Sequence, residues 1–523
     1  MRIRQAVNTE GPHKHINIHR AFQIHYAFKF INLFLGFFFQ ILVVKTLPPS
    51  GYATYAIFLA ILLTMERLLS FGIDRTLLRY VPSLTADGDY QGLAALLKRV
   101  ALVRGGSILV ALGAIGLLAT FARDTLLMGE GMLTICAFAV WYAGYAVTTD
   151  LEMLAQSWIV HATTAISGTI DVLLRSACVL LLALSGHEIS GATVIAISAV
   201  TTFVAVIIIL LKLIRLRPHI SSLLIATSEQ RLPRLSAKDA PLFAASIYAS
   251  NIGWLITSPS VVRIFAKGGL DIVTFSAFSF VQGLCVSIQR AFPGLMILPS
   301  LEPLFARFTM APARVFSSLS LVFKLELVCF LAFSILTGLA GREIIALVSR
   351  PEYAPYYYLL PLVMLILLFQ TIYRICEIVT SVQLKHTVFL ALWPVSLLGV
   401  AALYLTADRW GLLAVLFIPL TESAIRIGII MLAHRRVETW RAIDPVRSLQ
   451  VGTAAGGSVL FALLARYARP DFGNLTLAVL ATGLFFLTVF VVRPLRKDEV
   501  ASLSLTMPSS LQSLSRAITR WAR

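Results

Sequence analysis

Residues 189–214 read ISGATVIAISAVTTFVAVIIILLKLI, a stretch of 26 residues in which Lys212 is the only charged side chain. A helix needs about 20 apolar residues to cross a hydrocarbon core of ~30 Å. Stretches of this kind follow one another from Phe22 to Val492, joined by short polar turns. Hydrophobic residues make up 58% of the chain and charged residues 13%, about half the charged share of a soluble protein. The chain is therefore predicted to be an all-α polytopic membrane protein.

The hydrophobic pattern predicts fourteen membrane spans. Turn residues such as Pro48, Pro49 and Asp408 fall between them, as expected of connecting segments. The predicted spans are 21–44, 51–78, 97–121, 131–153, 160–185, 189–214, 240–262, 271–298, 314–340, 356–381, 386–406, 410–433, 450–466 and 474–493.

The placement of positive charge supports an even number of spans with both termini in the cytoplasm. In that topology the cytoplasmic segments hold more than twice as many Lys and Arg residues as the segments on the opposite side. This is the bias described by the positive-inside rule. The net charge of +18 then reflects a basic cytoplasmic face opposite anionic lipid, and it requires no nucleic-acid partner.

The connecting segments divide the chain into regions. The basic segment 215–239 is the longest interruption of the hydrophobic pattern, and it separates six predicted helices from eight. We expect a cytoplasmic basic tail at 1–20, an N-terminal lobe at 21–214, the linker 215–239, a C-terminal lobe at 240–433, two further helices within 434–493 and a cytoplasmic amphipathic tail at 494–523.

The termini and the cysteines suggest no metal site or cofactor. His13, His15, His19 and His25 could bind a metal, but a solvated tail beside the membrane is the favoured interpretation. The C-terminal run Leu511, Leu514, Ile518 and Trp521 has helical spacing, which favours a short helix on the inner leaflet. All five cysteines fall inside predicted spans without metal-type spacing, so we interpret them as packing residues.

Two short similarities suggest an internal duplication. The segment 54–58, TYAIF, opens the second span and 274–278, TFSAF, opens the eighth. These spans end in similar tetrapeptides, VPSL at 81–84 and LPSL at 298–301. A parallel repeat of six plus six helices is a transporter architecture in which the substrate site lies between the halves.

Several segments resemble the polysaccharide-exporter branch of the MOP superfamily, which also contains the MATE antiporters and the lipid II flippase. They are LPPSGYATYA at 47–56, LSFGI at 69–73, LRYVP at 78–82, RPEYAPY at 350–356 and LPL at 360–362. The resemblance covers roughly residues 20–435 and has no catalytic fingerprint. It implies two six-helix lobes around a central cavity and transport of polyprenyl-diphosphate-linked oligosaccharides, as in O-antigen flippases.

Polar stripes mark several of the predicted helices. Ionisable residues inside spans are costly, and they usually face a cavity or a partner. The stripes are His25, Lys29, Asn32, Gly36 and Gln40 in the first span; Glu66, Ser70 and Asp74, beside Arg67, in the second; Thr164, Gly168, Asp171, Arg175 and Cys178 in the fifth; Gln282, Gln289 and Arg290 in the eighth; Gln370, Arg374, Glu377 and Ser381 in the tenth; and Glu422 with Arg426 in the twelfth.

Basic residues in five separate helices predict an electropositive cavity, because guanidinium groups can bind phosphate oxygens in a bidentate manner. The candidate substrate-binding residues are Lys29, Arg175, Arg290, Arg374 and Arg426. Asp171, Glu377 and Glu422 each lie about one helical turn from an arginine, and they are candidates for coupling transport to a proton gradient. For each of these charges a structural ion pair remains the alternative.

The function predicted from the sequence is that of a flippase of the bacterial inner membrane working by alternating access. Its partners would be the lipid-linked oligosaccharide, membrane lipids and a polysaccharide polymerase or export machinery. The alternative is a MATE-type, cation-coupled exporter of small amphipathic compounds, whose cavity should be acidic and aromatic. There is no P-loop, HExxH motif, nucleophile elbow or Gly-rich dinucleotide turn, so an enzyme is disfavoured.

Overall fold

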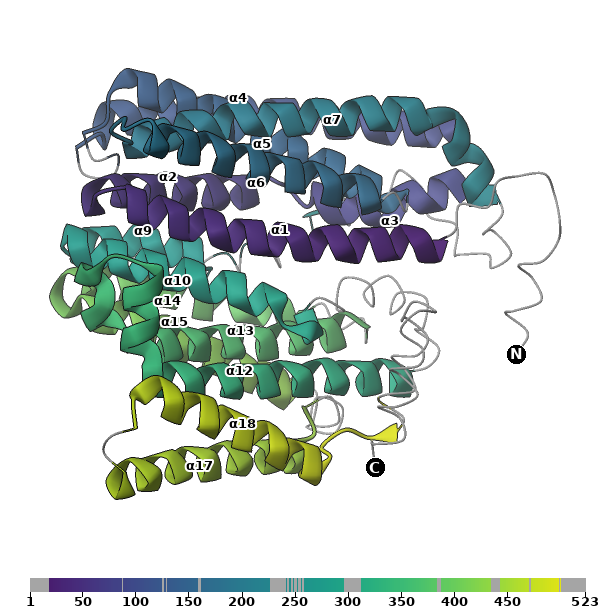
Figure 1. The fold of residues 1–523 in the computed structure, drawn as a ribbon. Coiled ribbons are helices and arrows are strands. Elements are labelled where there is room, and N and C mark those ends of the chain that lie inside the picture. The colour runs from purple at the N-terminus through teal and green to yellow at the C-terminus, as the bar shows by residue number, and fades with distance from the viewer. Residues whose placement is uncertain are drawn as a thin grey trace.

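The computed structural model describes residues 18–86, 88–124, 127, 129–158, 161–225, 241, 244–245, 248, 252, 255, 258–295, 312–382, 387–433, 443–469, 472–497 and 499. These residues form helices joined by short turns (Figure 1). The histidines at 13 and 15, most of the linker 215–239, the tetrapeptide 298–301 and the run 511–521 lie outside the described residues, as do the side chains of His19, His25 and Ser381.

Seven helices form the N-lobe, which lies along the upper side of Figure 1. Two of these helices begin at residues that favour a helix N-terminus. Pro49 occupies the first turn of α2, where no backbone N–H is needed. The Asp89 carboxylate caps α4 by accepting a hydrogen bond from the Gly92 backbone N–H. The helices are α1 (Ile18–Thr46), α2 (Pro49–Leu68), α3 (Ile73–Ala86), α4 (Tyr90–Phe121), α5 (Met132–Ser157), α6 (His161–Leu184) and α7 (Gly191–Ile225).

The predicted second span, 51–78, is not one continuous helix. The chain turns between α2 and α3, where Phe71 and Gly72 have left-handed φ angles of 47° and 71°. A Cβ atom on Gly72 would lie 2.5 Å from the Ala244 carbonyl oxygen, so another segment of backbone packs against this turn. Tyr248 Oη donates to the Leu68 carbonyl at 2.6 Å, which satisfies one of the carbonyl groups left at the end of α2.

A second group of helices forms the C-lobe in the middle of Figure 1. Ser258 caps α9 and Asp271 caps α10 through bonds to the first backbone N–H groups of each helix. The elements are α9 (Pro259–Gly269), α10 (Ile272–Ala291), α12 (Pro312–Val348), the 3₁₀ turn η2 (Pro351–Tyr356), α13 (Leu359–Val382), α14 (Thr387–Trp410) and α15 (Leu412–Ala433).

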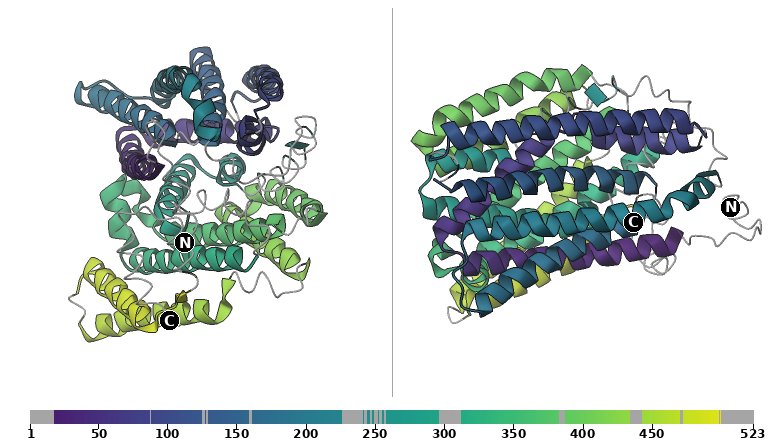
Figure 2. Two further views of the ribbon diagram at one scale, coloured as in Figure 1. Left: turned by 90° about the vertical axis from the view of Figure 1, so that its right-hand side faces the viewer. Right: turned by 90° about the horizontal axis from the view of Figure 1, so that it is seen from above.

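The last two described helices form a hairpin at the edge of the C-lobe. Helices α17 (Pro445–Ala468) and α18 (Asn474–Val492) pack on each other and on α12, on the side away from the N-lobe (Figures 1 and 2). Small residues on α17, including Ala454 and Ala455, pack with Ala332 and Ile335 of α12.

Twelve of the described helices are long and apolar enough to cross a membrane. They account for twelve of the fourteen predicted spans, and their outward faces carry exposed leucines and phenylalanines such as Leu109, Leu133 and Phe121. The predicted span 386–406 coincides with α14, which is not among the twelve, and most of the span 240–262 lies outside the described residues. The chain is thus a multi-pass membrane protein.

Candidate functional site

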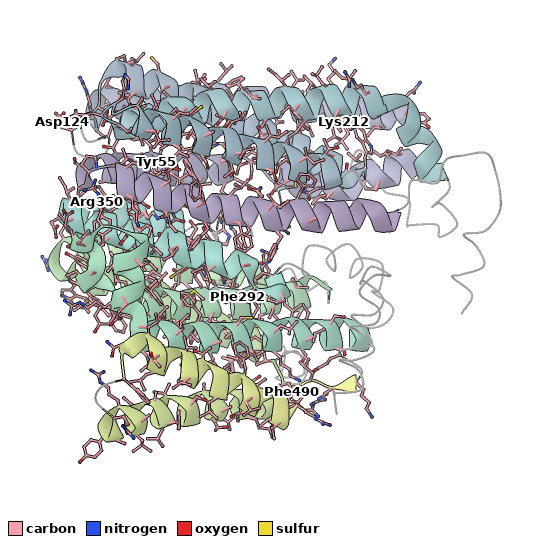
Figure 3. All side chains as sticks on the ribbon, in the orientation of Figure 1. Tyr55, Asp124, Lys212, Phe292, Arg350 and Phe490 are labelled. Atoms are coloured by element: carbon pink, nitrogen blue, oxygen red, sulfur yellow. The ribbon has the colours of Figure 1, made fainter. Side chains whose placement is uncertain are left out.

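The two lobes are joined at the end of the molecule where α1 ends and α2 begins. Ser276 Oγ of α10 donates to the Pro49 carbonyl at 2.7 Å, and Gln40 Nε2 of α1 donates to the Phe280 carbonyl at 3.1 Å. At the same end Arg350 donates to the Val44 carbonyl at 3.3 Å (Figure 3). We call this region the closed end.

Aromatic rings and a buried arginine fill the space behind these hydrogen bonds. The Tyr55 ring stacks on Trp141 at 6.3 Å, and Tyr52 meets Phe280 of the C-lobe edge to face at 6.3 Å. Arg263 of α9 is 7% exposed, and its Nε donates to Gln282 Oε1 at 2.5 Å. The closed end is therefore filled by packed side chains.

A basic cluster lies further along the same interface. The Lys29 ammonium group on α1 is close enough to Arg290 of α10 and Arg374 of α13 for their charges to interact. Arg67, at the end of α2, is close to the same two arginines. Lys29, Arg67 and Arg374 are half-buried and Arg290 is exposed. The basic cluster thus brings together side chains from four helices and both lobes.

The basic cluster and the closed end lie at different depths. Lys29 precedes Gln40 by eleven residues on α1, which is about 16 Å along a helix axis. Figure 1 shows the axes of α1 and α10 moving apart in this direction. Three of the five predicted substrate-binding residues, Lys29, Arg290 and Arg374, therefore lie together where the lobes diverge, and Arg67 joins them.

The other two predicted arginines lie inside their own lobes. Arg175 Nη2 is 2.7 Å from Asp171 Oδ2, and its guanidinium carbon lies 5.7 Å from the centre of the Phe39 ring and 5.9 Å from that of Trp141. This arrangement holds α6 against α1 and α5.

Arg426 is 1% exposed inside the C-lobe. Its Nη2 lies 2.9 Å from Glu422 Oε1 and also contacts Ser396 Oγ, while the guanidinium carbon lies 5.3 Å from the centre of the Tyr373 ring. Two of the predicted coupling carboxylates, Asp171 and Glu422, are therefore in i,i+4 ion pairs. Glu377 is half-buried on α13, one turn from Arg374.

An ion-pair network inside the N-lobe was not predicted from the sequence. Arg104 of α4 binds both oxygens of Asp150 of α5, at 2.6 and 2.5 Å, and lies 3.5 Å from Glu66 of α2. The Glu66 carboxylate also interacts with the charge of Arg67 in the basic cluster. The available signal was the presence of basic residues in the predicted span 97–121 and of acidic residues in the next span, 131–153.

A second unpredicted network joins the C-terminal hairpin to the C-lobe. Lys324 of α12 is fully buried, and its Nζ lies 2.7 Å from both Asp444 and Glu499. These carboxylates stand just before α17 and shortly after α18. Burial alone would raise the pKa of Asp444, but the hydrogen bond from Lys324 and the charges of Lys324, Arg496 and Arg447 hold its pKa below the ordinary value.

Comparison with known proteins identifies the fold. The structure resembles that of the lipid II flippase MurJ in its inward closed conformation, with a TM-score of 0.58 and 11% sequence identity over 94% of this chain and 99% of that one. It also resembles the eukaryotic MATE transporter AtDTX14, with a TM-score of 0.50 and 14% identity over 82% of this chain and 99% of that one. The chain has the fold of these transporters. No family model and no curated protein sequence matches it.

The shared fold confirms the resemblance at the level of architecture. The lipid II flippase and the MATE transporter are the relatives that the sequence segments pointed to, and both are transporters rather than enzymes. The identities are low, so the likeness concerns the fold, and the chemistry of the site must be argued from this chain's own residues.

Proposed function

We propose that this protein is a flippase that moves a polyprenyl-diphosphate-linked oligosaccharide or exopolysaccharide repeat unit across the bacterial inner membrane. The observation that carries the proposal is the basic cluster of Lys29, Arg67, Arg290 and Arg374, which both lobes contribute. Like charges at short range repel one another, and an anion bound between them removes that cost. A diphosphate supplies two phosphate groups for these donors.

The proposed mechanism is alternating access by rocking of one lobe against the other. The hydrogen bonds of the closed end shut one side while the basic cluster lies where the lobes diverge. With both termini in the cytoplasm, the closed end faces outward and the basic cluster is reached from the cytoplasm, where lipid-linked sugars are made. Binding of the diphosphate would draw the two sides of the basic cluster together and favour opening of the other end.

An ion gradient would drive the cycle, because the sequence contains no nucleotide-binding motif. Asp171, Glu377 and Glu422 remain the proposed coupling carboxylates. The alternative exporter of amphipathic cations is less favoured, since a cation would be repelled by the basic cluster.

The direct test is a flipping assay in liposomes with a fluorescent polyprenyl-diphosphate oligosaccharide. Lys29→Ala should lower the rate about tenfold or more, because a hydrogen bond to a charged group contributes roughly 1.5–3 kcal/mol. Lys45→Ala on the same helix, at the closed end, is the matched control and should transport at the wild-type rate. Equal rates for the two variants, or transport of cationic dyes in place of the lipid, would contradict the proposal.

A further inference from the structure

Glu326, on the membrane-spanning helix α12, is a buried carboxylate to which the proposed transport cycle assigns no role. It is 1% exposed. Among the described residues no lysine, arginine or histidine forms an ion pair with it; its hydrogen-bond partner is the backbone N–H of Leu295, at 2.8 Å from Oε1. In this it differs from Asp171 and Glu422, whose charges are balanced by arginines.

Glu326 contacts the segment that immediately follows α10. Helix α10 ends at Ala291, Phe292 takes an extended conformation, and Pro293, Gly294 and Leu295 are helical again (Phe292 is labelled in Figure 3). A Cβ on Gly294 would lie 2.6 Å from the Val322 carbonyl oxygen and 2.8 Å from Glu326 Cγ. The glycine therefore lets the chain pack directly on the carboxyl group.

The same segment positions Arg290 of the basic cluster. On one side of Arg290, Gln289 Nε2 donates to the Leu367 carbonyl at 3.1 Å and to Thr371 Oγ1 at 2.9 Å, which fixes α10 to α13. On the other side, Leu295 is bound by Glu326. Arg290 thus stands between two anchors, and only the second anchor can gain or lose a proton.

The charged and titratable groups around Glu326 are few. On α12 itself, Cys329 interacts with it electrostatically, and Lys324 is held by Asp444 and Glu499. The neighbouring elements carry other charges: α13 has Arg374 and Glu377, α10 has Arg290, η2 has Glu352, α17 has Arg447 and Arg466 at its two ends, and α18 has none. No positive charge among the described residues stands against the carboxylate.

We infer that Glu326 is a proton-binding site of the C-lobe that controls the end of α10 and, through it, the position of Arg290. This inference rests on the proposed transport function. An isolated carboxylate ion is costly to bury, so the packed arrangement holds the neutral acid, whose carbonyl oxygen accepts from Leu295 N–H. When the segment after α10 moves away, water reaches the group and the proton leaves. Protonation of Glu326 therefore favours packing of the segment after α10 against α12, and rising pH favours release of that segment.

Hydrogen exchange measured by mass spectrometry tests the proton site without any transport substrate. We would follow the peptide covering 290–295 between about pH 6 and about pH 9, the range in which buried glutamates titrate, and correct for intrinsic exchange. Wild-type protection should fall as pH rises, on the order of tenfold per pH unit at most. Glu326→Gln mimics the neutral acid and should show no such fall. Glu343→Gln, an exposed position on the same helix, is the matched control and should follow the wild type.

Flipping assays at the same pH values test the link to transport. Glu326→Gln should lower the rate and remove its pH dependence, while Glu343→Gln should do neither. Wild-type protection that stays constant or rises with pH overturns the proton site, whether or not the Gln variant folds. If exchange behaves as expected but no lipid-linked sugar is transported by the wild type, the proposed function fails and the proton site stands.

Discussion

The arginines inside the lobes and the basic side chains between the lobes have different electrostatic surroundings. Arg104, Arg175 and Arg426 each contact one or two carboxylates within their own lobe. The charges of Lys29, Arg67, Arg290 and Arg374, which come from both lobes, act on one another, and Arg67 also interacts with the Glu66 carboxylate. Paired charges fix helices to each other, whereas a group of like charges is unfavourable until an anion binds. Under the proposed function, this difference separates residues that maintain the lobes from residues that bind the ligand.

The largest effect on stability is expected inside the N-lobe. Arg104→Leu would leave the half-buried Asp150 carboxylate without its counterion beside the buried Glu66 carboxylate, at a cost of about 3–5 kcal/mol. Thermal unfolding of the purified protein measures this loss. The double variant Arg104→Leu/Asp150→Leu should recover most of it. If the single variant unfolds like the wild type, Arg104 does not belong with the structural charges.

Arg290→Ala should lower transport and leave stability unchanged, because Arg290 belongs to the basic cluster and forms no ion pair with any other described residue. Its unfolding free energy should stay within about 0.5 kcal/mol of the wild type, as for other exposed positions. The flipping rate should fall about tenfold, since a hydrogen bond to phosphate is lost. Arg409→Ala, at an exposed position on α14, provides the control. A large loss of stability with normal transport would place Arg290 with the structural charges.

Weakening the closed end should have a smaller effect. Ser276→Ala removes one hydrogen bond to the Pro49 carbonyl, which contributes about 1 kcal/mol. The measurement uses a cysteine placed at the buried position Ala53 in a protein whose native cysteines are replaced. In the Ser276→Ala variant we expect this cysteine to react about fivefold faster with a membrane-impermeant thiol reagent than in the protein that keeps Ser276. Thr421→Ala is the control, because the Thr421 hydroxyl donates to a carbonyl of its own helix, and it should leave the reaction rate unchanged. A slower reaction in the Ser276 variant would show that this bond does not close the interface.

The smallest effect is expected from pH at the border of the C-terminal hairpin. The pKa of Asp444 is lowered, so its ion pairs contribute fully above the ordinary value of 3.8 and are lost only as pH falls through the lower folded value. Unfolding temperatures should therefore not change between about pH 5 and about pH 8 on account of this group. Asp444→Asn should remove the additional loss of stability below pH 4. A decline that begins near neutral pH in the wild type and is absent from the variant would contradict this assignment.

The sequence predicted the helices well because each has to cross an apolar layer, and mean hydropathy records that requirement directly. It did not predict the turn between α2 and α3. Leu69–Ile73 continues the hydrophobic pattern, and the turn depends on the approach of Ala244, which lies more than 170 residues away in sequence. Gly72 was the one local signal, since its left-handed φ is unfavourable for other residues.

Prediction of the site succeeded where helical spacing was informative. The stripe on α1 singled out Lys29, and the i,i+4 spacing indicated the Asp171–Arg175 and Glu422–Arg426 pairs. The spacing within one helix could not show that Arg175 and Arg426 lie away from Lys29, nor that Arg104 meets Asp150, 46 residues later. Such partners follow from the packing of helices against each other.

The bond between Lys324 and two carboxylates has a consequence for the topology of the chain. Asp444 and Glu499 lie 55 residues apart, and one ammonium group holds both of them, so the hairpin between them is closed into a loop. Closing a loop of this length lowers the conformational entropy of the chain much as a crosslink does. The Lys324 ammonium group thus attaches both ends of the hairpin to α12. If one of the two carboxylates dissociates from Lys324, the other end of the hairpin stays attached.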